Sequence, residues 1–110
     1  MKEVKAFVHR GRAADIVHAL IDAGFDQVSL VDVKGTLQAL TPRETEYSVE
    51  YGDAFITEVK LEVVCSDTDL EKVLAIMRAQ GRASRASGWV YVSDIEQGMR
   101  LDFAPPTQGA

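Results

Sequence analysis

The chain has 110 residues, 46% of them apolar, and a net charge of −5. This length fits one domain with a single core, and small domains leave much surface exposed and often associate. The spread of acidic residues argues against nucleic-acid binding, which needs clustered Lys and Arg. The single cysteine, Cys65, excludes an internal disulfide and a cysteine-based zinc site, and its place in an apolar run predicts a buried side chain.

No apolar run approaches the roughly 20 residues needed to cross a bilayer, and the first residues, MKEVKAF, lack a signal peptide's hydrophobic region. We therefore expect a cytoplasmic protein without direct membrane insertion. The last six residues, PPTQGA, predict a flexible tail over 105–110 after a single domain over 1–104.

The first half of the chain predicts a strand, a helix and a second strand. Residues 2–9 alternate in polarity, as in a half-buried strand. From Arg12 onward, apolar residues recur at the spacing of an amphipathic helix, and Gly24 supplies the left-handed residue that ends it. Residues 26–35 are rich in β-branched side chains and predict the second strand. The first strand's alternation places three apolar side chains on one face: Val4, Ala6 and Val8.

The second half repeats this order. Residues 57–66 alternate between an apolar and a charged face, which predicts the third strand. Ser66 and Asp69 resemble the capping box of a helix that ends at Gly81, and residues 88–95 predict the fourth strand. Two such units predict an α+β fold, the ferredoxin-like βαββαβ sandwich, with an antiparallel sheet and both helices on one face.

The other face of this sheet mixes apolar and charged side chains. Its expected members are Phe7, Val64, Trp89 and Tyr91 among Lys5, Glu58, Lys60 and Glu62. Such a face is too apolar for plain solvent and too charged for a private core. We expect it to be a self-association surface, because the acidic charge disfavours RNA bases stacked on a sheet.

A stretch without a sustained period, GTLQALTPRETEYSVEYGDAF, separates the second and third strands. Compact domains usually connect their elements with about 4 to 6 residues, so an insert near 20 residues indicates a working part.

The segments around this insert resemble, in their order, a PII signal-transduction protein. They are KEVKAFVHRGRAADIVHALIDAGF, VSLVDVKG, EVKLEVVCSD and WVYVSDIEQGMR, with an insert of the family's typical length between the second and third. The resemblance implies a homotrimer that is not an enzyme. It also implies a T-loop over about 36–55, a B-loop over about 81–88, and control of a partner, a transporter or enzyme, through the T-loop.

The resemblance further implies an adenine nucleotide, ATP, ADP or AMP, with or without magnesium, in each cleft between subunits. The implied nucleotide-binding residues are Phe7, Ser29, Gly35, Val64, Arg82, Arg85, Ser87, Gly88 and Arg100. Three of them, Phe7, Ser29 and Val64, match the pocket for base and ribose. Backbone N–H groups of small-residue turns and fixed arginines suit a phosphate chain, which fits the B-loop and Arg100.

The sequence departs from the family pattern in the B-loop, in the C-terminal region and at the base of the T-loop. In the B-loop, Arg82-Ala83 stands where Thr-Gly is expected, and Ala86-Ser87 occupies the next Gly-x slot. Trp89 replaces the B-loop lysine, and Asp102 replaces the second C-terminal arginine. Ala39 and Glu58 replace the glutamine and lysine that hold Mg-ATP and 2-oxoglutarate in the nitrogen sensors. These differences argue against a 2-oxoglutarate response and favour a divergent branch that binds ADP or AMP as readily as ATP.

Tyr51 occupies the position that some family members modify by uridylylation. Glu50 precedes it as in the family, but Ser48 and Val49 replace the surrounding Arg-Gly. We therefore expect Tyr51 to contact a partner rather than to be modified.

The main alternative is a metal-binding trimer of the divalent-cation-tolerance type, which uses the same fold without a nucleotide switch. Its candidate ligands, His9, Cys65, Asp67 and Glu96, match no recognised metal pattern, so we expect no metal site. An acylphosphatase-type enzyme needs an asparagine, and the chain contains none. Both histidines, His9 and His18, are expected to be exposed or at a rim rather than catalytic.

Overall fold

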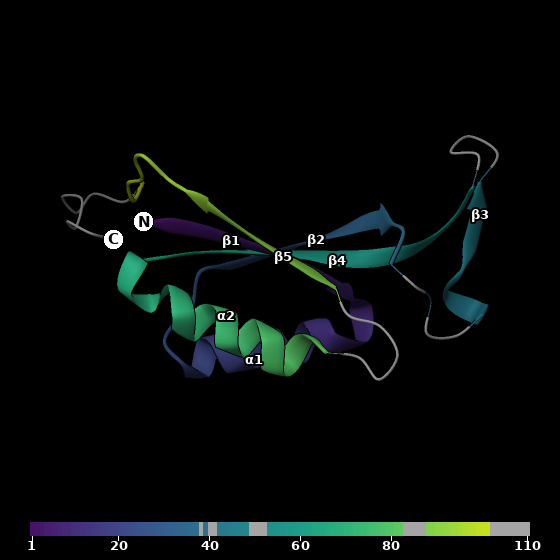
Figure 1. Ribbon diagram of the computed structural model, residues 1–110, viewed down its shortest axis with the longest axis horizontal. Helices are drawn as coiled ribbons and strands as arrows, with labels where there is room; N and C mark the ends of the chain where they lie inside the picture. The colour runs from purple at the N-terminus through teal and green to yellow at the C-terminus, as the bar shows by residue number, and fades with distance from the viewer. Residues whose placement is uncertain (38, 40–41, 49–52, 83–87, 102–110) are drawn as a thin grey trace.

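The computed structural model describes residues 1–37, 39, 42–48, 53–82 and 88–101. Four strands form an antiparallel sheet in the order β2-β4-β1-β5, and both helices cover one face of it (Figure 1). The main elements are β1 (Lys2–His9), α1 (Arg10–Asp22), β2 (Val28–Gly35), β4 (Asp53–Cys65), α2 (Leu70–Gly81) and β5 (Trp89–Asp94). This arrangement confirms the predicted ferredoxin-like βαββαβ fold.

The core lies between the sheet and the helices, where the predicted strand alternation puts it. Val4, Ala6 and Val8 are buried on the helix side of β1. Opposite them in the register stand Val63, Leu61 and Val59 of β4. The helices contribute Ile16 and Leu20 of α1 and Val73 and Met77 of α2. Each fully buried side chain of this size contributes about 1.5–3 kcal/mol to folding.

Helix α1 ends at Asp22, and the predicted glycine, Gly24, belongs to its C-terminal cap. Gly24 has a φ of 96°, and its N–H donates to the Ile21 carbonyl at 2.9 Å. The next N–H, of Phe25, donates to the Leu20 carbonyl at 2.8 Å. These two bonds form a Schellman motif, which requires a left-handed residue at the position of Gly24.

Helix α2 begins differently from the prediction. A 3₁₀ turn, Asp67–Asp69, precedes the helix, and the Ser66 hydroxyl donates to the Asp69 carboxylate at 3.1 Å. The side chain of Ser66 caps no backbone N–H, so the predicted capping box does not form. The two side chains satisfy each other instead.

The insert between β2 and β4 is more regular than its sequence indicates. A 3₁₀ turn, Pro42–Glu44, leads into β3 (Glu46–Ser48), which pairs with the first residues of β4. Strand β4 therefore begins at Asp53, ahead of the predicted start at 57. Figure 1 shows this hairpin projecting beyond the ends of the two helices.

Two polar residues are more buried than predicted. His9 is only 1% exposed, so the expectation of an exposed or rim histidine is wrong for it, whereas His18 is exposed. The reason is that β1 runs directly into α1, which leaves His9 at the junction, opposite Glu58 in the β1–β4 register. Glu58 itself is 4% exposed.

The buried state predicted for Cys65 is confirmed, and burial raises the pKa of its thiol. A small buried thiol of this kind behaves as an apolar core side chain.

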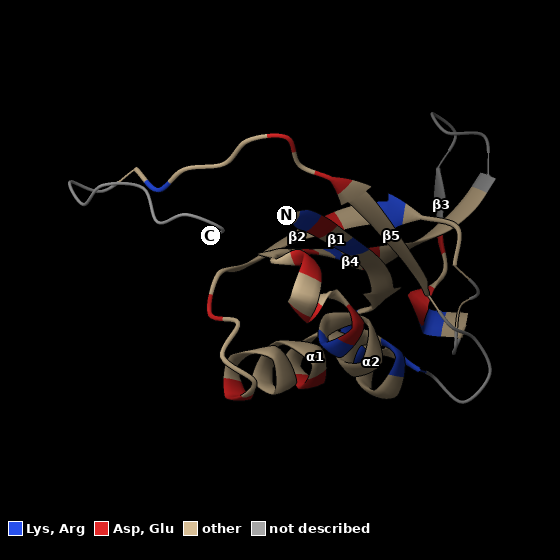
Figure 2. Ribbon diagram, turned by 60° about the vertical axis from the view of Figure 1, so that its left-hand side comes forward, with Lys and Arg blue, Asp and Glu red and all other residues tan. Residues whose placement is uncertain are grey.

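Figure 2 shows Lys and Arg interspersed with Asp and Glu over the described strands and helices. This mixture agrees with the dispersed charge of the sequence.

Candidate functional site

A cavity of about 270 Å³ lies at the base of the projecting hairpin. Its walls come from four strands and the segment that leaves β2: Phe7, Val33, Lys34, Gly35, Thr36, Leu37, Glu58, Trp89 and Tyr91. The cavity thus has aromatic rings on one side, a backbone turn on another and a carboxylate. Two of the predicted nucleotide-binding residues, Phe7 and Gly35, meet here.

Glu58 fills the space in front of Gly35. The Leu37 N–H donates to Oε2 of Glu58 at 2.9 Å. A Cβ atom built on Gly35 would lie 1.9 Å from the same oxygen. Only a residue without a side chain therefore allows the carboxylate to reach the turn. This close approach explains Gly35 at the end of β2.

Gly88, which directly precedes β5, stands in a similarly tight place against β1. A Cβ atom at Gly88 would lie 1.8 Å from the backbone carbonyl oxygen of Phe7. The neighbouring Phe7 and Tyr91 rings meet edge to face, with centroids 5.9 Å apart. Trp89 follows Gly88 as the first residue of β5 and is 63% exposed. The start of β5 is thus fitted closely against β1.

A second cavity, of about 360 Å³, lies between α2 and β5. Arg82 and Gly88 line it together with Trp89, which also lines the first cavity. The two predicted nucleotide-binding residues of the B-loop that the structure describes, Arg82 and Gly88, therefore lie beside the hairpin base. Arg85 and Ser87 fall outside the described residues, as does the T-loop residue Tyr51.

Two other predicted site residues, Val64 and Arg100, lie at the far end of the sheet. Val64 and Arg100 line a third cavity, of about 590 Å³, near the start of β1. Val64 stands opposite Glu3, four residues along the strand from the pair formed by Phe7 and Lys60. At about 3.4 Å per residue, the two groups are separated by about 14 Å along the sheet. One copy of the chain does not bring them together.

Ser29 lies between the two groups. It is exposed on the edge strand β2, opposite Glu62 of β4. By register it shares the open face with Phe7 and Val64, while the helices cover the other face.

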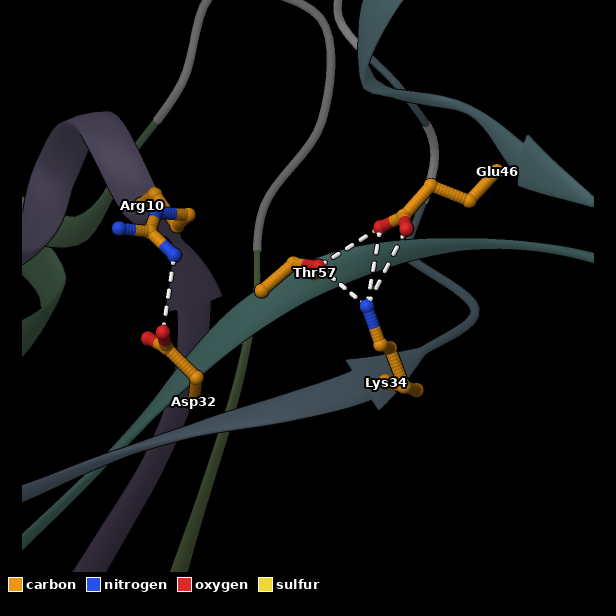
Figure 3. A network of polar contacts seen from close by, with 5 residues as sticks. All are labelled: Arg10, Asp32, Lys34, Glu46 and Thr57. Atoms are coloured by element: carbon orange, nitrogen blue, oxygen red, sulfur yellow. Dashed lines mark hydrogen bonds and ion pairs between the residues drawn. The ribbon is translucent and has the colours of Figure 1, made fainter.

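Polar contacts fix the hairpin to the sheet (Figure 3). Lys34 Nζ donates to both carboxylate oxygens of Glu46 at 3.2 Å and to the Thr57 hydroxyl oxygen at 3.0 Å. The Thr57 hydroxyl in turn donates to Glu46 Oε2 at 2.7 Å. The hydrogen bond from Thr57, followed by that from Lys34, lowers the pKa of the Glu46 carboxyl. Lys34 also lies 5.2 Å from the centroid of the Phe55 ring.

These contacts escape prediction from the sequence alone. Glu46 and Thr57 are 11 residues apart and meet only because β3 folds back on β4. The burial of Glu58 escapes prediction too, since the alternation of β4 assigns it to an exposed face. The one available signal for that burial was Gly35 beside a loop, which indicates a close approach to the backbone.

Within the described part of the chain, no group of three or more His, Cys, Asp or Glu side chains could hold a metal ion. No helix among the same residues is long and apolar enough to span a membrane.

The fold and the hairpin that projects from its sheet define a ferredoxin-like domain with a long insertion between β2 and β4. The family profile described as "Nitrogen regulatory protein P-II" matches residues 1–102. The chain therefore belongs to the P-II family of signal-transduction proteins. This result confirms the family resemblance of the sequence.

Several relatives named "Nitrogen regulatory protein P-II" match along most of their length. The protein of Rhodobacter capsulatus is 30% identical over 102 residues, which cover 92% of this chain and 91% of the relative. That of Rhizobium meliloti is 26% identical with the same coverage. "Nitrogen regulatory protein P-II 1" of Methanothermobacter thermautotrophicus is 26% identical over 92% of this chain and 89% of its own. These names describe regulators rather than enzymes.

Proposed function

We propose that this P-II family protein binds an adenine nucleotide between copies of the chain and controls a partner protein through its projecting hairpin. One observation carries the proposal: the expected contact residues fall into two groups at opposite ends of the sheet. Phe7, Gly35 and Gly88 form the first group, and Val64 and Arg100 form the second. A site that uses both groups requires two neighbouring copies.

Self-association is supported by the uncovered surface of the sheet. Phe7 and Tyr91 pack edge to face there, and Trp89, Tyr91 and Val64 are 63, 55 and 46% exposed. Large exposed apolar side chains on one face are typical of surfaces that pair with another protein. Cyclic closure of three copies would give every copy the same contacts on each side. We propose a homotrimer.

We assign the phosphates to arginine side chains and to backbone N–H groups. Arg82 follows α2 and is exposed at the cavity shared with Gly88 and Trp89. Arg100 of a neighbouring copy is the second cation. Guanidinium groups bind phosphate oxygens through paired N–H donors, which makes these two arginines the main charged contacts.

The base is assigned to the aromatic wall of the first cavity. Trp89 presents an exposed indole beside Phe7, and flat aromatic faces stack well on nucleobases. Trp89 stands where the family pattern has a phosphate-binding lysine. The site therefore lacks one phosphate contact and has an additional surface for stacking. This change supports ADP and AMP as effectors alongside ATP, with magnesium required only where a longer phosphate chain binds.

The hairpin is the segment that we propose contacts the partner protein. Its stem leaves the sheet at Gly35, which lines the first cavity, and the contact of Glu46 with Lys34 holds it in place. A ligand at the cavity and a partner on the hairpin would bias the same segment, so each would change the affinity of the other. The partner is a transporter or metabolic enzyme, and the regulator acts in the cytoplasm, where adenine nucleotides are found.

Isothermal titration calorimetry tests the nucleotide site. ATP, ADP, AMP and cyclic AMP are titrated with and without magnesium and 2-oxoglutarate. We expect at least one nucleotide to bind more tightly than about 1 mM, which corresponds to roughly 4 kcal/mol, and we expect 2-oxoglutarate to add nothing. If every nucleotide binds more weakly than that, the protein has no adenine-nucleotide effector.

Two variants test the assignment of Arg100. Arg100→Ala should weaken the bound nucleotide by about 1.5–3 kcal/mol, the usual worth of a hydrogen bond to a charged group. Lys72→Ala is the control, since it also removes one positive charge but Lys72 lies on α2 over the Phe25 ring. Equal affinities of both variants would show that Arg100 does not contact the phosphates.

A further inference from the structure

Strand β5 has apolar side chains that face the helix side of the sheet and remain exposed. Val90 stands opposite Ala6 of β1, a residue of the core, and Val92 stands opposite Val4, another. The two residues of β1 are fully buried, whereas the two of β5 are 39 and 42% exposed. The helices pack over the central strands β1 and β4, which accounts for this difference. The helix side of the edge strand is therefore an apolar surface that a ligand can reach.

The cavity of about 360 Å³ between α2 and β5 lies at this surface. Among its lining residues, Val8 and Met77 are buried in the core, Leu74 is half-buried and Val90 is exposed. The apolar lining thus extends from the core to the surface. A cavity of this size, with apolar walls and a few polar groups, is typical of sites that bind small molecules.

Two guanidinium groups supply the polar part of the lining. Arg78 belongs to the last turn of α2, and Arg82 directly follows the helix. Within the described part of the chain, neither pairs with a carboxylate, although the protein has a net charge of −5. The C-terminal end of a helix favours cations, which explains arginine here but not its place beside an apolar cavity. Like charges four residues apart repel each other, and a bound anion would remove that repulsion.

We propose that this cavity binds a small amphipathic carboxylate, a medium-chain fatty acid, with its hydrocarbon chain against Met77 and Val90 and its carboxylate on Arg78. Guanidinium and carboxylate groups form paired hydrogen bonds, and each methylene removed from water adds to the affinity. The apolar part of this site lies on the helix side of the sheet, whereas Phe7 of the proposed base pocket lies on the other face. Arg82 is already assigned to the nucleotide phosphates, so Arg78 is the residue that distinguishes the two sites.

The fluorescence of Trp89, the single tryptophan of the chain, tests the site because its side chain lines the cavity. Sodium octanoate is titrated in the absence of nucleotide, and sodium chloride is titrated in parallel to correct for ionic strength. We expect a saturating change with a midpoint at about 1 mM or below, as for other ligands of about ten non-hydrogen atoms. No saturation by about 10 mM octanoate would overturn the proposal.

Two further probes separate the contributions of the chain and the charge. Hexanoate buries two methylenes fewer and should bind about 10-fold more weakly than octanoate. Octylammonium has the same chain as octanoate but a positive charge, so the arginines should repel it and no saturation should occur. Equal affinities for hexanoate and octanoate, or for octanoate and octylammonium, would refute the proposed site.

Arg78→Ala tests the carboxylate contact directly. Arg78 is exposed, so the variant should fold, and its affinity for octanoate should fall about 10- to 100-fold. Lys72→Ala is the matched control: it also removes one positive charge from α2, but Lys72 lies 5.8 Å from the centroid of the Phe25 ring. The control should change the affinity less than about threefold, because salt screens a distant charge. Equal affinities of the two variants would refute the role of Arg78.

The outcome of these titrations is separate from that of the nucleotide titration. None of them contains nucleotide, and Arg78 is not among the residues assigned to the nucleotide. Loss of octanoate binding in Arg78→Ala with unchanged nucleotide binding would support two sites. Loss of both in Arg78→Ala would show that octanoate occupies the nucleotide site, and the proposal of a second site would fail.

Discussion

Replacing Gly88 by alanine probes how tightly the start of β5 is fitted against β1. The new Cβ would lie 1.8 Å from the Phe7 carbonyl oxygen, a distance that real Cβ contacts do not show. Because the obstacle is backbone, β5 has to move away by more than about 1 Å, which stretches the nearest ladder hydrogen bonds beyond about 3.5 Å. Losing one or two such bonds, at about 0.5–1.5 kcal/mol each, predicts a loss of about 0.5–3 kcal/mol.

Urea unfolding at one fixed protein concentration measures this loss. With a slope of about 1–3 kcal/mol per molar urea, the midpoint should fall by about 1 M. Gly11→Ala is the control, since nothing lies within 4 Å of its added Cβ and Gly11 is in α1. Alanine in a helix is favoured over glycine, so this variant should be up to about 1 kcal/mol more stable. The argument from close approach fails if Gly88→Ala has the midpoint of the wild type.

Two further predictions concern association and the hairpin. Tyr91→Glu puts a charge on the open face, so light scattering should report a single chain of 12.1 kDa. The control, Ile21→Glu on the helix side, should leave the assembly intact. An intact Tyr91→Glu assembly would contradict the proposed surface. The Glu46 carboxyl should titrate by NMR below its usual pKa of 4.5, since Thr57 and Lys34 favour its charged form. The contribution of Glu46 to holding the hairpin is then fully present above its usual pKa and is lost as the pH falls through its lowered pKa. A titration midpoint of Glu46 at or above pH 4.5 would show that the network with Thr57 and Lys34 is absent.

The sequence predicts those parts of the fold that depend on local pattern. The strand alternation around Val4 and Ala6 places the core face correctly because a strand has a period of two. The end of α1 is predicted because Gly24 is the left-handed residue of its cap. The hairpin strand β3 is missed, since its three residues are stabilised by pairing with β4 and not by their own pattern.

The sequence does not predict how residues meet at the base of the hairpin. Phe7 and Gly35 line one cavity there, and their role in nucleotide binding stays a prediction. Glu58 is assigned to an exposed face by alternation, yet the turn after Gly35 covers it. Whether an outward residue is buried depends on what a loop places over it, and a loop without a period carries no such signal.

The separation of the two residue groups allows a direct test of a site built between copies. If Arg82 and Arg100 contact one ligand from neighbouring chains, neither Arg82→Ala nor Arg100→Ala homotrimers contain a complete site. Unfolding the two variants together and refolding them at equal amounts should produce clefts in which both arginines are present, about one quarter of all clefts for random closed trimers.

Calorimetry of the mixture should therefore recover tight binding at about one quarter of the wild-type stoichiometry, while each variant refolded alone recovers none. A doubly substituted chain, Arg82→Ala with Arg100→Ala, mixed with either single variant is the control. These mixtures contain no cleft with both arginines, because one of the two arginines is absent from every chain. If the mixture of single variants binds no better than its components, both arginines act within one copy or neither contacts the ligand, and the site between copies is refuted.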